Sequence, residues 1–283
     1  MKCYNFRIPC EGRGDVFSII PMGCVHLGND NCEKEKFKNM VDYIKNKEKT
    51  YWVGMGDYCD FINYKDKRFD PGTIDQKYSI KSLKTLHQEE TKEMAEILKP
   101  IANKCIGLVE GNHEQTIDRD YLFNPVDYLA TELNTVNLSY ISIVSLLFDR
   151  GSHSTRGVDI FLWHGDGSVA NDGGALNKVM RLESKFDADI YLMAHVHRKV
   201  CGTRIKHFKT RSKVPLLLQK KKLFGVTGTF LSTYQQDKKS YGEKPAYDPT
   251  PIGVLKITIE PFVKQRIGNR KSIELPPNMH ISE

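Results

Sequence analysis

The chain has 283 residues, of which 40% are hydrophobic and 27% are charged, a composition typical of an ordinary globular protein. No apolar stretch approaches the roughly 20 residues of a membrane span, and the seven cysteines are an odd number without a CxxC spacing, which favours free thiols over a disulfide framework. The net charge of +7 permits a polyanionic partner without establishing one.

The first 60 residues are predicted to form strands and one helix. Residues 1–14 indicate a leading strand or arm without a signal-peptide core, so we expect a cytoplasmic protein with no membrane partner. The apolar run 16–22 predicts a strand that ends in Gly23-Cys24-Val25-His26. Residues 33–47 carry apolar side chains at helical spacing and predict a helix.

A second short apolar run, 51–55, breaks at glycine and is followed by two carboxylates, Asp57 and Asp60. It predicts a buried strand whose carboxyl end opens into a loop, the place where open α/β sheets bind ligands. A polar insert at about 61–104 follows, with a helix predicted from about 74 to 98 and ended by Pro100. The insert is expected either to hang over the rim of the site or to cover one sheet face.

The middle of the chain repeats the pattern of strand and polar loop. Residues 106–110 predict a strand that leads into Gly111-Asn112-His113-Glu114, and Asn124-Pro125 predicts the start of a helix through Leu133. The alternating run 138–148 predicts one half-buried strand. His153 lies in a turn without a motif, and we interpret it as a surface residue.

Two further strands are predicted before residue 198. The run 158–163 ends in His164-Gly165-Asp166-Gly167, and the run 188–193 ends in Ala194-His195-Val196-His197. An amphipathic helix that follows Gly173-Gly174 connects them.

The remaining residues, 198–283, predict a basic region rich in short strands, the clearest at 223–231 and 254–259. Between Arg198 and Lys222 there are ten lysines or arginines and no acidic residue. Such a run is consistent with the solvated face of an edge strand, and equally with a surface that faces the substrate.

The five runs share one property, which is that a metal-competent side chain follows each predicted strand. The five motifs are Cys24-Val25-His26, Gly56-Asp57-Tyr58-Cys59-Asp60, Gly111-Asn112-His113-Glu114, His164-Gly165 and Ala194-His195-Val196-His197. Taken together, they resemble the motifs of the calcineurin-like metallophosphoesterase family. The resemblance spans residues 16–197. It implies an α/β fold, a four-layer α/β/β/α sandwich of two mixed sheets, formed by residues 1–283 as a single domain.

The resemblance also implies a dinuclear metal centre. The first metal would be bound by Cys24, His26, Asp57 and His197, and the second by Asp57, Asn112, His164 and His195, with Asp57 as the bridge. His113 would contact the phosphate and act as general acid, with Asp60 as its carboxylate partner. The ligand types suit Zn, Fe, Mn or Ni.

The sequence departs from the family pattern at two positions. Ala194 stands where the family has Gly, which matters only if the backbone there needs a positive φ. Cys24 stands where the family has Asp. A ligating thiolate would favour Zn or Fe over Mn, whereas a buried thiol would act as a small hydrophobe.

Three functions remain open from the sequence. The first is a metal-dependent phosphoesterase, a phosphodiesterase or nuclease, whose substrate is a nucleic acid or nucleotide. The second is a phosphomonoesterase that acts on phosphoproteins or small metabolites. The third is a non-catalytic member of the same fold that binds nucleic acid through its basic strands.

Overall fold

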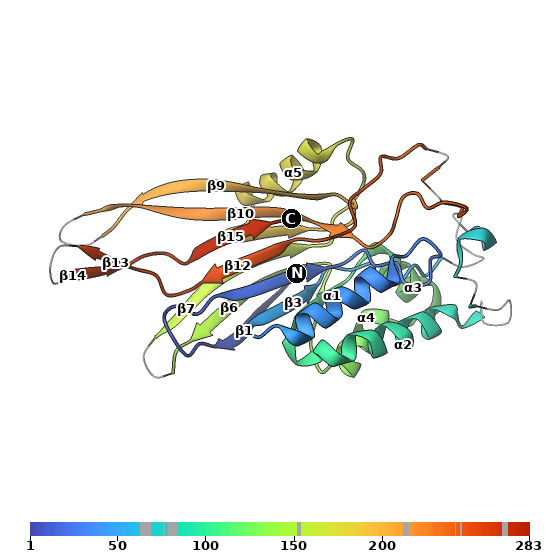
Figure 1. Cartoon of the computed structure of the whole chain (residues 1–283), viewed down its shortest axis with the longest axis horizontal. Helices are drawn as coiled ribbons and strands as arrows, with labels where there is room; N and C mark the ends of the chain where they lie inside the picture. The colour runs from blue at the N-terminus through green and yellow to red at the C-terminus, as the bar shows by residue number, and fades with distance from the viewer. Residues whose placement is uncertain are drawn as a thin grey trace.

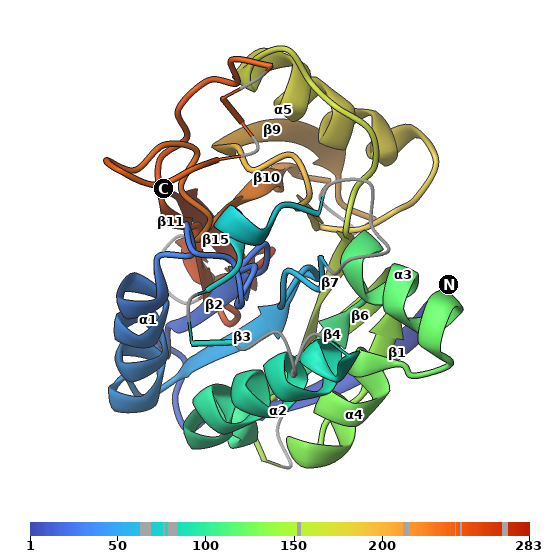
Figure 2. The ribbon, with the colours of Figure 1, turned by 90° about the vertical axis from the view of Figure 1, so that its right-hand side faces the viewer.

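Two mixed β-sheets face each other in the computed structural model, and helices cover their outer surfaces (Figures 1 and 2). The structure describes residues 1–62, 69–75, 77–78, 84–151, 154–211, 215–240, 242–243, 245–267 and 271–283. The predicted four-layer α/β/β/α sandwich is confirmed. In this part of the chain, no helix is both long and apolar enough to cross a membrane.

The first sheet has seven strands in the order β1-β6-β7-β8-β10-β11, with β9 paired to β10. Its parallel pairs are β1–β6, β7–β8 and β8–β10, and its other pairs are antiparallel. The strands are β1 (Lys2–Pro9), β6 (Ile141–Asp149), β7 (Thr155–Trp163), β8 (Ile190–Met193), β9 (Lys199–Lys209), β10 (Leu217–Thr229) and β11 (Gly253–Val254).

The second sheet has six strands in the order β15-β12-β2-β3-β4-β5. The segment from β2 to β5 is parallel, whereas β12 and β15 are antiparallel to their neighbours. These strands are β2 (Phe17–Met22), β3 (Thr50–Gly54), β4 (Cys105–Val109), β5 (Asn137–Ser139), β12 (Lys256–Glu260) and β15 (Asn278–Ser282). A separate hairpin joins β13 (Lys264–Ile267) to β14 (Lys271–Glu274).

The helices divide between the two outer faces. α1 (Lys34–Asn46), α2 (Leu86–Leu98) and α4 (Pro125–Glu132) cover the second sheet, and α5 (Asp172–Met180) covers the first. The other helices in the described part of the chain are α3 (Asn112–Tyr121) and the 3₁₀ turns η1 (Pro71–Thr73), η3 (Lys99–Lys104) and η4 (Arg181–Ser184).

Three apolar clusters explain why the central strands are hydrophobic on both faces. On β3, Val53 packs between the sheets, whereas Trp52 points the other way, into the cluster beneath α1, α2 and α4. On β8, Leu192 and Tyr191 divide in the same manner, and Tyr191 packs under α5. Successive side chains of a strand point to opposite faces, so strands covered on both sides lose the polar alternation.

The predicted helix at 74–98 is shorter than expected, because α2 begins only at Leu86. Residues 76 and 79–83 lie outside the described part of the chain. Before them, the Asp70 side chain accepts a hydrogen bond from Gly72 N at 2.9 Å and opens η1. Ile74 then forms a bridge with Asn29. The predicted helix therefore does not begin at Ile74, because this residue has an extended backbone conformation directly after the Asp70-Pro71-Gly72 turn.

The predicted single strand at 138–148 is two strands that lie in different sheets. β5 ends at Ser139, which has a φ of 60°, and β6 begins at Ile141. β5 pairs with β4 in the second sheet, and β6 pairs with β1 and β7 in the first. A left-handed residue turns the chain sharply, and periodicity alone cannot reveal such a corner.

Candidate metal centre

The predicted metal ligands follow the carboxyl ends of five strands. β2 leads to Cys24 and His26, β3 to Asp57, β4 to Asn112, β7 to His164, and β8 to His195 and His197. β2, β3 and β4 run parallel in one sheet, and β7 and β8 run parallel in the other. Loops from both sheets therefore meet at one end of the sandwich, as the sequence predicted.

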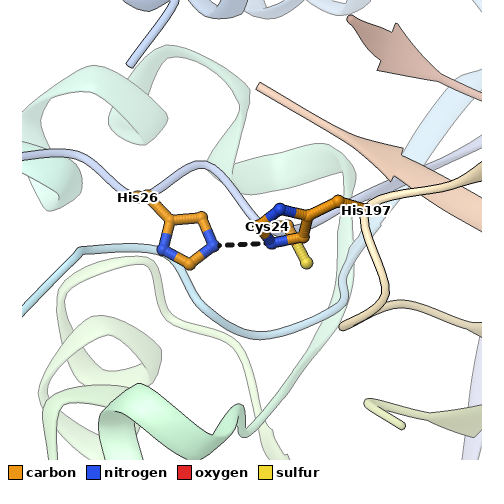
Figure 3. A group of neighbouring side chains, drawn as sticks. All are labelled: Cys24, His26 and His197. Atoms are coloured by element: carbon orange, nitrogen blue, oxygen red, sulfur yellow. Dashed lines mark hydrogen bonds between the residues drawn. The ribbon is translucent and has the colours of Figure 1, made fainter. Parts of the chain in front are cut away.

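The first group of donor atoms comprises Cys24 Sγ and the ring nitrogens of His26 and His197, which all lie within 4.8 Å of one another. The Nε2 atoms of the two imidazoles are 3.0 Å apart and face each other (Figure 3). Two nitrogens bound to one ion at about 2.0–2.1 Å are separated by roughly 3 Å. The pair therefore has the spacing of two ligands of one metal ion.

The second group comprises Asp57, Asn112, His164 and His195. Asn112 Oδ1 lies 3.2 Å from His164 Nε2 and 2.8 Å from His195 Nδ1. Asp57 Oδ2 lies 3.2 Å from His164 Nε2. Two imidazole nitrogens, one amide oxygen and one carboxylate oxygen thus point into a common space, a donor set suited to a divalent transition metal.

Asp57 joins the two groups through one oxygen atom. Its Oδ2 is 3.2 Å from His164 Nε2 and 4.0 Å from His26 Nε2, whereas its Oδ1 accepts a hydrogen bond from His113 N at 3.1 Å. Burial opposes its ionisation, yet the neighbouring imidazoles hold the pKa of Asp57 well below its usual range. The carboxylate is therefore ionised and faces both groups through Oδ2.

The backbone at the site is unusual. Cys24, His26, Asp57, His195 and His197 have positive φ values of 49°, 52°, 52°, 68° and 55°. Each such conformation costs about 1–3 kcal/mol in a residue that is not glycine, and it persists where the surrounding structure requires it. Strain concentrated on five of the seven predicted ligands is a sign of a functional site. Ala194 does not have a positive φ, so its methyl group is accommodated there.

Glu114 fastens the loop that carries Asp57, a role that the sequence did not reveal. Its carboxyl group accepts hydrogen bonds from Asp57 N at 2.9 Å, Tyr58 N at 2.8 Å and Gly111 N at 2.8 Å. Burial and the Asp57 charge raise the pKa of Glu114 to about 7. Its position three residues after Gly111 is typical of a helix-capping glutamate. This spacing is the sequence feature from which the role could have been predicted.

We expect Glu114→Ala to destabilise the metal-free protein by about 3 kcal/mol or more, because three buried N–H groups lose their acceptor. Glu114→Gln should lower the free energy of unfolding by less, since its amide oxygen can still accept some of these hydrogen bonds. Urea unfolding measures both, with the exposed Glu132→Ala on α4 as control. An effect of Glu114→Ala no larger than that of the control would show that the loop is held by other contacts.

His113 and Asp60 lie together, but their contacts differ from those predicted. His113 Nδ1 forms its hydrogen bond with the main-chain carbonyl of Asp60. The Asp60 carboxylate lies 3.3 Å from His26 Nδ1 and accepts a hydrogen bond from Asn29 Nδ2 at 3.1 Å. Asp60 therefore orients a metal ligand with its side chain and the predicted general acid with its backbone. Donor atoms of His26, Asp60 and His113 also lie within 4.8 Å of one another.

Cys24 is placed for either of its two predicted roles. Its side chain is fully buried, and its sulfur accepts a hydrogen bond from His195 N at 3.3 Å. Burial and the nearby Asp57 charge raise the pKa of the thiol well above its ordinary value. Without a cation Cys24 is a neutral thiol, whereas a bound cation would deprotonate it outright.

We expect Cys24 to ligate the first metal, which would give the cobalt-substituted protein a thiolate-to-metal charge-transfer band. Cys24→Ala should abolish the band and weaken the first site selectively, and Cys24→Asp should shift the preference toward Mn. Absorbance titration with Co²⁺ tests this, and Cys10→Ala is the control because Cys10 is also buried but lies beside Asp15. Unchanged metal binding by Cys24→Ala would mean that Cys24 only packs.

A cavity of about 360 Å³ opens onto the donor groups. Beyond the predicted residues, its wall contains Arg198 and the apolar side chains Ile62, Val169, Val196 and Leu231. Arg198 is held by Asp248 at 2.7 Å and Asp172 at 3.5 Å. Val196 lies within the Ala194-His195-Val196-His197 motif, whereas sequence motifs do not mark the other wall residues, because they come from loops that only the fold brings together.

The insert contributes little to the cavity in the described part of the chain. Ile62 lines it, and residues 63–68, expected at the rim, lie outside the described residues. α2 packs against α4, α1 and η3 and buries Met94 and Leu98. Its role as the cover of a sheet face is therefore the one that the structure supports.

Most of the basic run leads away from the cavity. β9 and β10 form a long antiparallel pair that extends toward the end of the molecule opposite to α3 (Figure 1). Along it, Arg204 and Lys206 pair with Glu183, and Lys220 pairs with Asp189 at 2.6 Å. The interpretation of the basic run as the solvated face of an edge strand thus applies to β9. In the described part of the run, Arg198 lines the cavity wall. Residues 212–214, like His153, lie outside the described part.

No protein-family model matches the chain, and no curated protein sequence matches it. Among solved structures, it is similar to Vps29 of Chaetomium thermophilum, with a TM-score of 0.37 and 13% identity over 94% of this chain and 96% of that one. It is also similar to the NAD nucleotidase (NadN) of Haemophilus influenzae, with a TM-score of 0.40 and 10% identity over 87% of this chain and 47% of that one. The chain thus spans about half of the nucleotidase. Neither likeness bears on what the chain binds.

Proposed function

From its calcineurin-like metallophosphoesterase fold and its two groups of metal-competent side chains, we propose that the chain is a metal-dependent phosphoesterase. Its substrate would be a phosphodiester, either a nucleotide or a nucleic acid, which it would act on as a phosphodiesterase or nuclease. The observation that carries the proposal is the convergence of Asp57 Oδ2 on His26 and His164, because one carboxylate oxygen shared by two donor groups is suited to a pair of cations.

The donor groups fit two divalent ions of the Zn, Fe, Mn or Ni type. Cys24, His26, His197 and Asp57 would hold the first, and Asp57, Asn112, His164 and His195 the second. When bound, such ions would supply Lewis acidity toward a phosphoryl group and a water molecule at neutral pH. The chain orients its imidazoles for this task through Asp60, which contacts His26 Nδ1, and through Met55 O, which lies 2.7 Å from His164 Nδ1. Such partners fix the ring orientation and tautomer of a metal ligand.

His113 is the proposed general acid. Its Nδ1 forms a hydrogen bond with the Asp60 carbonyl, which is an acceptor only, so the proton sits on Nδ1 and Nε2 is the nitrogen that exchanges a proton. The side chain lines the cavity next to Asp57 and Asn112. From there Nε2 can donate a proton to the oxygen that leaves phosphorus.

The size of the cavity supports the proposal of a nucleotide-sized ligand. Its volume of about 360 Å³ falls within the range of small-molecule sites. The apolar side chains Val169, Val196 and Leu231 offer a surface for a base or another planar group, and Arg198 offers a cation for a second phosphate. Arginine is well suited to phosphate through its planar set of donors.

Model substrates separate the proposed class from its rivals. The metal-loaded protein should cleave bis-p-nitrophenyl phosphate in preference to p-nitrophenyl phosphate, and then a nucleotide or nucleic-acid diester. Cleavage of the monoester alone, with no action on nucleic acid, would contradict the proposal and indicate a phosphomonoesterase. Binding of nucleic acid through β9 and β10 without any hydrolysis would favour the non-catalytic alternative.

A further inference from the structure

Glu90, on α2, is a buried carboxyl group outside both donor groups. Its side chain is 1% exposed, and its Oε2 accepts a hydrogen bond from Phe61 N at 3.0 Å. Burial and the nearby Asp60 charge raise the pKa of Glu90 well above its ordinary value. Burying a carboxyl group costs free energy unless the group is hydrogen-bonded, and the hydrogen bond from Phe61 N offsets part of this cost.

The peptide unit between Asp60 and Phe61 connects Glu90 to the proposed general acid. Its C=O group accepts the hydrogen bond from His113 Nδ1, and its N–H group donates to Glu90 Oε2. The peptide unit is planar and rigid. A rotation that moved its N–H away from Glu90 would therefore also move its C=O away from His113, and hydrogen bonds in such a chain strengthen one another.

The surrounding backbone is shaped around this contact. Phe61 has a φ of 55°, a left-handed conformation that an aromatic residue rarely adopts. On the other side of the carboxyl group, Gly28 has a φ of 103°, and a Cβ atom at this position would overlap Glu90 Oε1. Glu90 is therefore closely packed between two main-chain segments.

We propose that Glu90 is a positioning residue for the general acid, an inference that rests on the proposed function. By holding the Asp60–Phe61 peptide, it fixes the carbonyl that keeps the His113 proton on Nδ1. The Nε2 atom of His113 is then directed to the leaving oxygen of the substrate. The position of the Glu90 oxygen relative to Phe61 N therefore matters for this role, and the charge of the carboxyl group does not.

Two matched variants separate reach from charge. Glu90→Gln keeps an oxygen acceptor at the same distance but cannot ionise, whereas Glu90→Asp remains ionisable and shortens the side chain by one methylene. The control is Glu96→Asp, an exposed position on the same helix. The readouts are kcat and KM for bis-p-nitrophenyl phosphate and for a diester with an alkyl leaving group, which needs more help from a general acid.

We expect Glu90→Gln to stay within about threefold of the wild type on both substrates. Glu90→Asp should lose about tenfold or more in kcat on the alkyl diester and less on the nitrophenyl diester, with KM unchanged, because general-acid assistance contributes about 10²–10⁴. Gly28→Ala should reproduce the pattern of Glu90→Asp, since its methyl group displaces the carboxyl. Equal losses on both substrates, or a Glu90→Gln loss as large as that of Glu90→Asp, would overturn the assignment.

A second readout does not depend on turnover. In the ¹H–¹⁵N spectrum of the zinc-loaded protein, His113 Nδ1–H should give a protected resonance, assigned by its loss in His113→Ala. It should persist in Glu90→Gln and be lost or strongly shifted in Glu90→Asp. An unchanged resonance in Glu90→Asp would contradict the positioning role. If the wild type hydrolyses no phosphoester, the proposed function fails, and this resonance still decides the role of Glu90.

Discussion

Asp57→Asn is expected to reduce turnover below detection. The Asp57 carboxylate is buried and ionised, and its Oδ2 faces both His26 and His164. The amide of asparagine has nearly the same shape but no charge, so it cannot offset two cations held in one buried site. We therefore expect the variant to lose at least about one of the two bound metal ions.

Metal content by elemental analysis and hydrolysis of bis-p-nitrophenyl phosphate measure the effect. Asp189→Asn is a matched control, because Asp189 is also buried but lies immediately before β8, paired with Lys220 at 2.6 Å. The control should retain both metal ions and the full rate. Full activity of Asp57→Asn with both ions bound would show that Asp57 is not the bridge.

His113→Ala is expected to lower kcat by roughly 10²–10⁴, the usual contribution of a general acid, while metal content stays unchanged. The hydrogen bond from His113 to Asp57 Oδ1 comes from the backbone N–H, and alanine retains it. The side chain itself forms its hydrogen bond with the Asp60 carbonyl. Loss of this imidazole should therefore affect proton donation and not the metal ligands.

His87→Ala is the control for the loss of a buried imidazole. His87 lies on α2, where it packs against Tyr121 and Phe123 and outside the cavity wall. The His87→Ala variant should have a kcat close to that of the wild type. Loss of a metal ion in His113→Ala would instead assign His113 to the ligand set, together with His26 and Asp60, whose donor atoms lie within 4.8 Å of it.

Local sequence patterns predicted the elements that carry the site. The runs that became β2, β3, β4, β7 and β8 are short and apolar because both faces of each strand are covered, as Trp52 and Val53 show on β3. The helix α1 followed from its apolar spacing, with Phe37, Val41 and Ile44 buried. The family resemblance then implied one site at the strand ends, and the seven predicted ligands follow the carboxyl ends of these five strands.

Features set by tertiary structure were not predictable from local patterns. The corner at Ser139 and the start of α2 at Leu86 depend on backbone conformations that hydrophobic periodicity does not encode. α3 was not predicted, because its sequence is largely polar, and Asn112 and His113, which were predicted as site residues, form its first turn. Likewise, the Asp60 carboxylate contacts His26, whereas His113 contacts the Asp60 carbonyl. This arrangement depends on tertiary packing and not on local sequence.

The most direct test of a metal-dependent phosphoesterase is a titration of the metal-free protein with Zn²⁺ or Mn²⁺ during hydrolysis of bis-p-nitrophenyl phosphate. We predict that hydrolysis appears as metal binds, reaches its maximum near two ions per chain and stops when a chelator is added. Binding of fewer than about one ion per chain, or binding of about two ions with no hydrolysis of any phosphoester, would contradict a metal-dependent phosphoesterase.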